Sequence, residues 1–301
     1  MSELNLPMWN IGGGIKHYYN LYKMFVDTKR YYDTSHKLFD YVYDSFFGLR
    51  WNGGRTCFPR DTYPFSTVMS MVKNYNMLGV GFNWTFSNLL LQEEDLNDDY
   101  CNLALEQTHS PMNGVILTSD ILRDHIRTHY PKFRIIYSVC NGLNNLDAYK
   151  KALDENDIVV LHPDFNHNMD FLDKLPEKHR IEVMVNDICS FGCPFRQAHY
   201  VKLSQHILEQ SKNPIINFPD ELDYSPNKPG CMATQAGYDK DERNRITFSD
   251  IDNLLDMGFK HFKIIGREHE WDHFWERDLR PNLDQYFNRR MIKNAGLNLH
   301  I

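Results

Sequence analysis

Short apolar runs recur along the chain at regular intervals, and longer segments with helical periodicity separate them. Most runs are continuously apolar rather than alternating, which is typical of parallel strands buried on both faces. Eight runs predict strands, at 40–45, 78–84, 114–120, 133–139, 157–163, 181–187, 214–219 and 260–266. Eight strands alternating with helices predict an α/β fold, a (β/α)8 TIM-type barrel.

The segments between these runs predict helices at 64–76, 88–108, 119–130, 144–154, 167–175, 198–211 and 247–257, and a last one at 270–290. Several begin with Ser or Thr before an acidic residue, as at Ser119, which is a capping signal. Residues 15–38 are rich in Tyr and Lys and predict a helix that covers one barrel end. We therefore expect an N-terminal helical extension at 1–39, one barrel domain at 40–290 and a tail at 291–301.

An open, doubly wound sheet is the alternative architecture. Dinucleotide-binding sheets carry a G-x-G-x-x-G turn directly after a strand, and this pattern follows none of the eight runs. The glycine-rich IGGGIKHY at 11–18 has no strand candidate before it, so we interpret it as a loop. The barrel therefore remains the expected fold.

Composition narrows the class of partner. The chain of 301 residues is 42% hydrophobic, carries a net charge of −7 and has no run of Lys or Arg. A nucleic-acid partner held mainly through phosphates is therefore not indicated. The amino terminus lacks a basic stretch followed by an apolar one, and no 18-residue apolar run occurs. We therefore expect a cytoplasmic protein without membrane contact.

Cysteines gather where the predicted strands end, which is where TIM-type barrels carry their active sites. Five of the six cysteines follow a strand, and Cys101 is the exception. A buried cysteine taken singly is more often a small core residue. Several thiolates at close range repel one another, however, so a group of them indicates a cation, either zinc or an iron–sulfur cluster.

The central loop NDICSFGCPFR, at 186–196, holds Cys189 and Cys193. Structural zinc sites usually combine two such pairs, and this chain has one. Widely spaced single cysteines around one C-x-x-x-C suit an iron–sulfur cluster that bridges several loops. The three-cysteine signature of radical SAM enzymes, C-x-x-x-C-x-x-C, is absent, because position 196 is Arg. Zinc stays the alternative.

Polar residues at the same strand ends are candidates for binding and catalysis. Arginines suit a carboxylate or phosphate ligand, because guanidinium pairs bidentately with oxyanions; an ion pair with a nearby acid explains each of them equally well. These residues are Arg50, Arg55, Arg196 and Arg267, and Asn83 and Asn186 end two of the strands. His199 lies on the first helical turn beside the cysteines, where it suits a proton donor, a group that orients a ligand, or a packing residue.

The central segment IEVMVNDICSFGCPFRQAHY (181–200), with DIVVLHPDFNHNMDFL (157–172), resembles the centre of peptidase family U32, the collagenase-like group. ITFSDIDNLLDMGFKHFKIIGRE (246–268) is similar to a late segment of that family, and FDYVYDSFFGLRWNGGR (39–55) resembles its first strand and loop. The similarity spans roughly residues 40–270. It implies a TIM-type barrel, which in many members carries a 4Fe–4S cluster held by four cysteines.

The resemblance also implies site residues and chemistry. It assigns Cys189, Cys193 and Cys231 as cluster ligands and Cys57 as the fourth, with Cys140 as the alternative fourth ligand. In the family that this chain resembles, the better understood members are oxygen-independent hydroxylation factors. They act on ubiquinone precursors, transfer RNA or ribosomal RNA, with prephenate as the apparent oxygen donor. We therefore expect hydroxylation or a related modification of a small-molecule or RNA substrate, with an anionic, prephenate-like co-substrate. The expected catalytic residues are His199, Arg196 and Asn186, and the expected substrate-binding residues are Arg50, Arg55, Asn83 and Arg267.

Two other functions stay open. A U32-type peptidase would use Cys189 as nucleophile and His199 as base, although neither G-x-S-x-G nor H-E-x-x-H occurs. A non-catalytic subunit would bind an iron–sulfur cluster or zinc and act with a homologous partner subunit.

Overall fold

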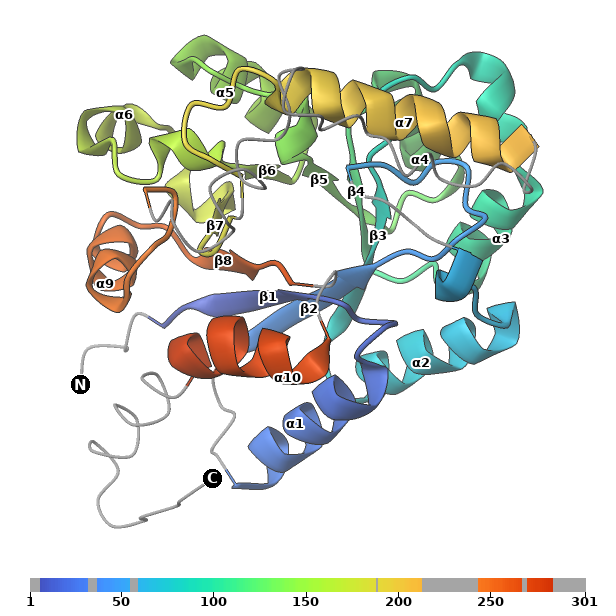
Figure 1. Ribbon diagram of the computed structural model, residues 1–301, viewed down its shortest axis with the longest axis horizontal. Coiled ribbons are helices and arrows are strands. Elements are labelled where there is room, and N and C mark those ends of the chain that lie inside the picture. Colours follow the sequence, from blue (N-terminus) through green and yellow to red (C-terminus); the bar gives the residue numbers. More distant parts are fainter. Residues whose placement is uncertain are drawn as a thin grey trace, which may run out of the picture.

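Eight parallel strands close a barrel in chain order. The structure, a computed structural model, describes residues 6–31, 37–54, 59–187, 189–212, 243–266 and 270–283. The strands are β1 (Met8–Gly12), β2 (Phe39–Asp44), β3 (Gly81–Phe86), β4 (Gly114–Leu117), β5 (Arg134–Tyr137), β6 (Ile158–Val160), β7 (Ile181–Met184) and β8 (His261–Ile264). β8 pairs with β1 and aligns Lys263 with Asn10, which closes the barrel (Figure 1). The predicted (β/α)8 fold is confirmed.

Helices alternate with the strands and form the outer ring (Figure 1). They are α1 (Tyr18–Tyr31), α2 (Phe65–Met77), α3 (Asp99–Gln107), α4 (Asp120–His129), α5 (Leu146–Glu155), α6 (Met169–Lys174), α7 (Arg196–Lys212), α9 (Phe248–Asp256) and α10 (Trp271–Phe274). Short 3-10 turns are η1 (Pro59–Asp61), η2 (Glu93–Asn97), η3 (Val139–Asn141), η4 (Pro163–Phe165) and η5 (Lys178–Arg180), and a π-helical turn, η6, covers Trp275–Leu279. The capping signal at Ser119 is confirmed, because its hydroxyl accepts from the Leu122 amide at 3.4 Å.

The helix predicted at 88–108 is wrong in its first half. The structure has the turn η2 followed by the separate helix α3. Asp98 between them has extended backbone, and its carboxylate accepts from the Cys101 amide at 2.8 Å. An aspartate in this position satisfies an amide that the first helical turn leaves without a partner, so it starts a new helix.

The amino-terminal segment corrects the predicted organisation. Residues 1–39, expected as an extension outside the barrel, contribute β1 to the barrel wall, and IGGGIKHY, expected to follow no strand, starts at the end of β1. MWNIG alternates between residues that face the helices and residues that face the interior, so a search for continuously apolar runs misses it. The strand predicted at 214–219 lies outside the described residues.

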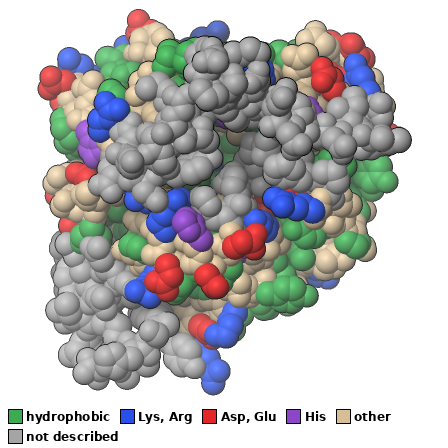
Figure 2. Space-filling view, viewed as in Figure 1, with side chains coloured by type: hydrophobic (Ala, Val, Ile, Leu, Met, Phe, Trp, Pro, Cys, Tyr) green, Lys and Arg blue, Asp and Glu red, His purple; other side chains and the backbone are tan. Residues whose placement is uncertain are grey.

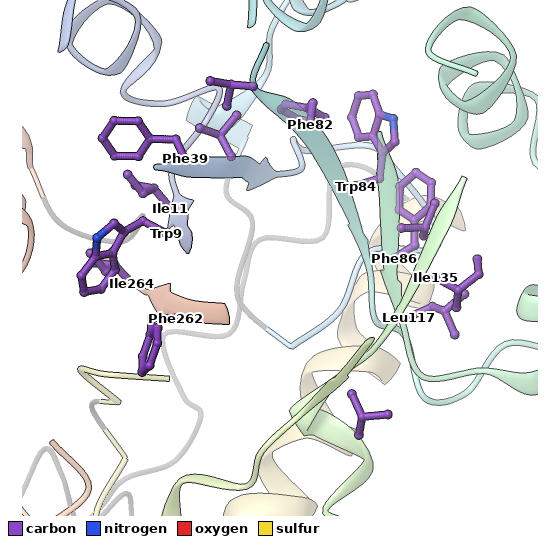
Figure 3. Close-up of a cluster of buried hydrophobic side chains, with 14 of the residues drawn as sticks. Trp9, Ile11, Phe39, Phe82, Trp84, Phe86, Leu117, Ile135, Phe262 and Ile264 are labelled. Atoms are coloured by element: carbon purple, nitrogen blue, oxygen red, sulfur yellow. The ribbon is translucent and has the colours of Figure 1, made fainter. Parts of the chain in front are cut away.

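Side chains alternate along each strand between two cores. The outward-facing ones pack beneath the helices and form the larger core, which Figure 3 shows around Trp9, Phe82, Trp84, Phe86 and Phe262. The inward-facing ones form a smaller cluster of Tyr41, Tyr43, Ile116, Ile136, Ile158, Val160 and Met184. Burial of each large apolar side chain stabilises the fold by about 1.5–3 kcal/mol, so the outer core holds the helices to the barrel.

A buried carboxylate lies in the barrel interior. Glu182 accepts hydrogen bonds from the Asn10 amide at 2.6 Å and from the Tyr41 hydroxyl. Its second oxygen pairs with the Lys263 ammonium at 3.2 Å, and that ammonium also lies 4.2 Å from the centre of the Tyr43 ring. The charge is buried together with its counter-charge and hydrogen-bond donors, which is the condition for burying an ion in a protein core.

Candidate active site

The connection from β7 to α9 departs from a simple barrel unit. In such a unit the helix follows its strand directly, and here α9 takes that place only after a long excursion of the chain. The chain returns to the point that it left, because the Ile246 amide donates to the Val185 carbonyl at 2.9 Å and Asn186 pairs with Arg245 in an antiparallel bridge. The excursion, residues 187–244, contains the two central cysteines and α7.

Helix α7 lies on the carboxyl-end rim of the barrel, over loops that follow three other strands (Figure 1). Asn88, after β3, donates to the Ser204 carbonyl at 3.1 Å. Gln197 donates to the Cys140 carbonyl, after β5, at 3.1 Å. Arg196 pairs with Asp164, after β6, at 3.1 Å. Helix α7 therefore lies over the end of the barrel at which TIM-type active sites lie.

The two central cysteines lie on a loop built from consecutive turns. The Cys193 amide donates to the Ser190 carbonyl at 3.3 Å, and the Arg196 amide donates to the Cys193 carbonyl at 3.3 Å. Gly192 occupies a left-handed position with φ of 65° inside the first turn, which favours glycine. Cys189 and Cys193 are both half-buried and neither forms a disulfide. The loop thus holds two thiols at the strand end, as the sequence predicts.

Arg196 is the buried centre of this loop. Its guanidinium donates to the Asp164 carboxylate at 3.1 Å and to the Ser190 carbonyl at 3.0 Å, and it lies 3.6 Å from the Asp187 carboxylate. Burial alone would lower the pKa of Arg196, but Asp187 and Cys189 outweigh burial and hold the pKa above its ordinary value. Arg196 therefore ties the cysteine loop to acids of the same chain; the catalytic role expected for it stays a prediction.

Asp164 and His162 complete the cluster, and the sequence analysis did not assign them to the site. Asp164 accepts from the Gly192 amide at 3.1 Å in addition to Arg196, so one carboxylate fixes the cysteine loop at two points. The His162 ring lies 3.5 Å from the Arg196 guanidinium. Burial, followed by Arg196, lowers the pKa of His162 to about 4. The available signal was their position at the end of the strand predicted at 157–163.

We expect His162 to make the protein sensitive to acid. Its folded pKa of about 4 lies below the value of about 6.5 for an unfolded chain. Between these two pH values the unfolded chain takes up a proton that the folded protein refuses, so the free energy of unfolding falls as the pH is lowered; above the window the residue contributes no pH dependence. Urea unfolding at pH 7, 5.5 and 4.5 measures this loss, and His162→Gln should show a smaller loss than the wild type across the same window. An equal loss of unfolding free energy in the wild type and in His162→Gln would contradict this prediction.

Cys140 is near the same cluster. It lies buried in η3, after β5, and a methyl group on Gly54 would come within 2.8 Å of its sulfur. The pKa of the Tyr200 phenol on α7 is raised well above its usual value, by burial and then by Cys140 and Cys189. Both thiols therefore act on one phenol. Within the part of the chain that the structure describes, no three His, Cys, Asp or Glu side chains form a ready group of metal ligands.

Asn186 joins the ends of β7 and β8. Its amide nitrogen donates to the Ile265 carbonyl at 2.6 Å, and its oxygen accepts from the Ile265 amide at 2.8 Å. These two bonds account for a structural role at the rim; the catalytic role expected for it stays a prediction.

We expect Asn186→Ala to lower the free energy of unfolding by about 1–3 kcal/mol, because it leaves the Ile265 backbone groups without partners. Urea denaturation measures the change. Asn144→Ala, at an exposed position, is the control and should stay within about 0.5 kcal/mol of the wild type. A loss no larger than that of the control would show that Asn186 does not hold the two strand ends together.

The other expected residues are more scattered. Arg50 forms an ion pair with Asp95, which is the alternative to ligand binding that the sequence left open for each arginine. Asn83 lies in the middle of β3, which continues to Phe86, so its fully buried side chain faces the barrel interior rather than the strand end. His199 lies on α7, and burial, then Lys202, lowers its pKa. Arg55, Cys57, Cys231 and Arg267 lie outside the described residues.

Surface features outside this cluster do not involve the expected residues. A groove of about 550 Å³ lies between α2 and the end of α3, and Asn113, at the amino end of β4, lines it. Figure 2 shows acidic and basic side chains of the described residues interspersed on one face, without a field of a single sign. Among the helices that the structure describes, none has both the length and the apolar character needed to cross a membrane.

Comparisons with known proteins identify the fold. No family model matches this sequence, and no curated protein matches it. The structure is similar to a solved one described as the U32 peptidase Mk0906, with a TM-score of 0.52 and 14% identity over 87% of this chain and 93% of the other. The resemblance to the U32 family predicted from the central loop is therefore confirmed at the level of the fold.

Proposed function

We propose that this U32-like barrel holds an iron–sulfur cluster at its carboxyl end and catalyses an oxygen-independent hydroxylation or related modification with an anionic co-substrate. The observation that carries the proposal is the placement of Cys189 and Cys193. Both thiols lie half-buried on one loop at the end of β7, and Asp164 and Arg196 fix that loop.

The donor set fits a cluster better than a protein nucleophile. Thiolates are the ligands of iron–sulfur clusters, and the charged Arg196 beside Cys189 offsets part of their negative charge. The proposed third ligand, Cys231, belongs to the excursion, whose return is fixed beside the first two because the Asn244 amide donates to the Cys189 carbonyl at 3.0 Å. The proposed fourth ligand, Cys57, comes three residues after Gly54 in the sequence. Gly54 packs against Cys140, the alternative fourth ligand. A bound cluster would supply one-electron chemistry.

The residues of the chain itself support an anionic small molecule as co-substrate. Arg55 and Arg267 are the arginines that we propose for oxyanion binding, because Arg196 already pairs with Asp164 and Asp187. The net charge of −7 and the mixed charges in Figure 2 favour a small-molecule substrate over RNA. Prephenate is the first co-substrate to test, and a homologous partner subunit is the first macromolecular partner.

Anaerobic purification followed by an absorption spectrum with iron, sulfide and zinc analysis tests the proposal. We expect about four irons and four sulfides per chain with a broad thiolate-to-iron absorption band, as for a 4Fe–4S cluster held by cysteines. A protein that contains zinc alone would replace the cluster with a zinc site. A metal-free protein that cleaves a casein substrate, and loses this activity on Cys189→Ser, would replace the proposal with a cysteine peptidase.

A further inference from the structure

Three histidines surround Tyr130 on the outer wall of the barrel, at the seam between α3 and α4. The ring centres of His109, His125 and His129 lie 5.8, 6.0 and 6.4 Å from that of Tyr130. His125 and His129 are one turn apart on α4, and their ring centres are 4.7 Å apart. Side chains four residues apart on a helix lie on the same face, so these two imidazoles can share one ion.

The neighbouring Asn102 fixes the protonation of His125. Both N–H groups of its amide are engaged, because the nitrogen donates to the Leu96 carbonyl at 2.8 Å and to the Asp98 carbonyl at 2.9 Å. Its oxygen therefore faces the Nε2 atom of His125, at 2.8 Å, as an acceptor. His125 then carries its proton on Nε2 and keeps a lone pair on Nδ1. Histidines that bind metals are oriented in this way, by donating the other ring N–H to an oxygen.

Charge and protonation at the seam also suit a cation. The neutral ring is the form of imidazole that binds a metal, so both histidines are available as ligands above their ordinary titration range. Glu106 lies one turn after Asn102 on α3, and after burial it is the group that raises the pKa of Tyr130. Glu106 therefore acts on Tyr130, the ring that the three histidines surround.

We propose that His125 and His129 bind a divalent transition-metal ion, with zinc as the first ion to test. Imidazole is a ligand for zinc, copper and nickel. Because no three His, Cys, Asp or Glu side chains are pre-arranged as ligands in the described ranges, water completes the coordination. This site lies on the barrel wall and uses imidazoles rather than thiols, so it does not depend on the proposed function.

The site would be linked to the rim of the barrel. The His125 ring packs at 77° against the Trp51 ring, with 5.8 Å between the two centres. Trp51 lies in the loop after β2, and Gly53 and Gly54 of the same loop pack against Ser87 and Cys140. An ion at the α3–α4 seam would therefore be one side-chain contact away from the loop that reaches Cys140.

Calorimetric titration of Zn²⁺ into the full chain tests the proposal. The host protein carries Cys189→Ser and Cys193→Ser, so that the thiol pair at the rim does not compete. We expect one Zn²⁺ per chain at pH 7.5 and weaker binding as the pH is lowered, because protons compete with the metal for the imidazole nitrogens. His129→Asn in this host should weaken binding at least about 100-fold, since loss of a residue that only orients a ligand already costs about 10- to 100-fold.

His109→Asn in the same host is the matched control. The Lys132 amide donates to the Nε2 atom of His109 at 3.0 Å, so this lone pair is already used, and zinc binding should be unchanged. His129 is exposed, and circular dichroism should show the fold intact in each variant. The proposal is overturned if the host binds no zinc, if His129→Asn binds it as tightly as the host, or if His109→Asn causes an equal loss.

Discussion

Replacement of both Cys189 and Cys193 with Ser should abolish iron binding in anaerobically prepared protein. A hydroxyl is a much poorer ligand for iron than a thiolate, and the two positions supply half of the proposed ligands from one loop. Each single variant should lower the iron content, because it removes one of the thiolates that hold the cluster. Iron and sulfide analysis, together with the intensity of the thiolate-to-iron absorption band, measures the loss. No co-substrate is needed for this measurement.

Cys101→Ala is the control for the cysteine variants. Cys101 is fully buried in α3, away from the predicted strand ends, and burial followed by Asp98 raises the pKa of its thiol, which keeps it protonated. Iron content should therefore match that of the wild type. Cys140→Ser and Cys57→Ser then separate the two candidates for the fourth ligand, since only one of them should lower the iron content. Full iron content in the Cys189→Ser, Cys193→Ser protein would exclude the assignment of these cysteines.

We expect Lys263→Met to lower the free energy of unfolding by about 3–5 kcal/mol, which is the cost of leaving one partner of a buried ion pair uncompensated. Met matches the length of Lys but brings no charge to Glu182, which is fully buried and pairs with Lys263 at 3.2 Å. Natural domains are stable by about 5–15 kcal/mol, so the loss is a large fraction of the total. Urea denaturation at pH 7 measures it.

The double variant Lys263→Met, Glu182→Gln removes the charge that the single variant leaves behind. Gln keeps an oxygen that accepts from Asn10 and Tyr41, so most of the lost stability should return. A single variant as stable as the wild type would mean that Glu182 is not held by Lys263. A double variant no more stable than the single one would point to lost packing instead of lost charge.

The strands were predictable where both faces are buried by apolar side chains. β2 to β8 all coincide with predicted runs, because their outward-facing positions are apolar and interior positions such as Ile116, Ile158 and Val160 are apolar as well. β1 was missed because MWNIG is a short run that Asn10 interrupts, and the partner of Asn10, Glu182, is 172 residues away in the sequence. A polar residue inside a barrel is explained only by its partners, and no local pattern reveals them.

The rim was predictable in its chemistry and less so in its arrangement. The sequence predicted that Cys189 and Cys193 follow β7, and the structure places both on one loop there. It did not reveal that Arg196 pairs with Asp164, because that contact joins loops of two different strands, 32 residues apart. Asn83 was placed at the strand end because the length of β3 could not be read from the apolar run alone.

The bridge between Asn186 and Arg245 brings the two ends of the excursion side by side. A segment whose ends are already adjacent is in effect a closed appendage on a finished wall, and lengthening such a loop costs only about 0.6 kcal/mol for each doubling. New specificity can arise by changes in this connection while the strands beneath it keep their pairing, provided that Cys189, Cys193 and the contacts of α7 with the loops after β3, β5 and β6 are retained.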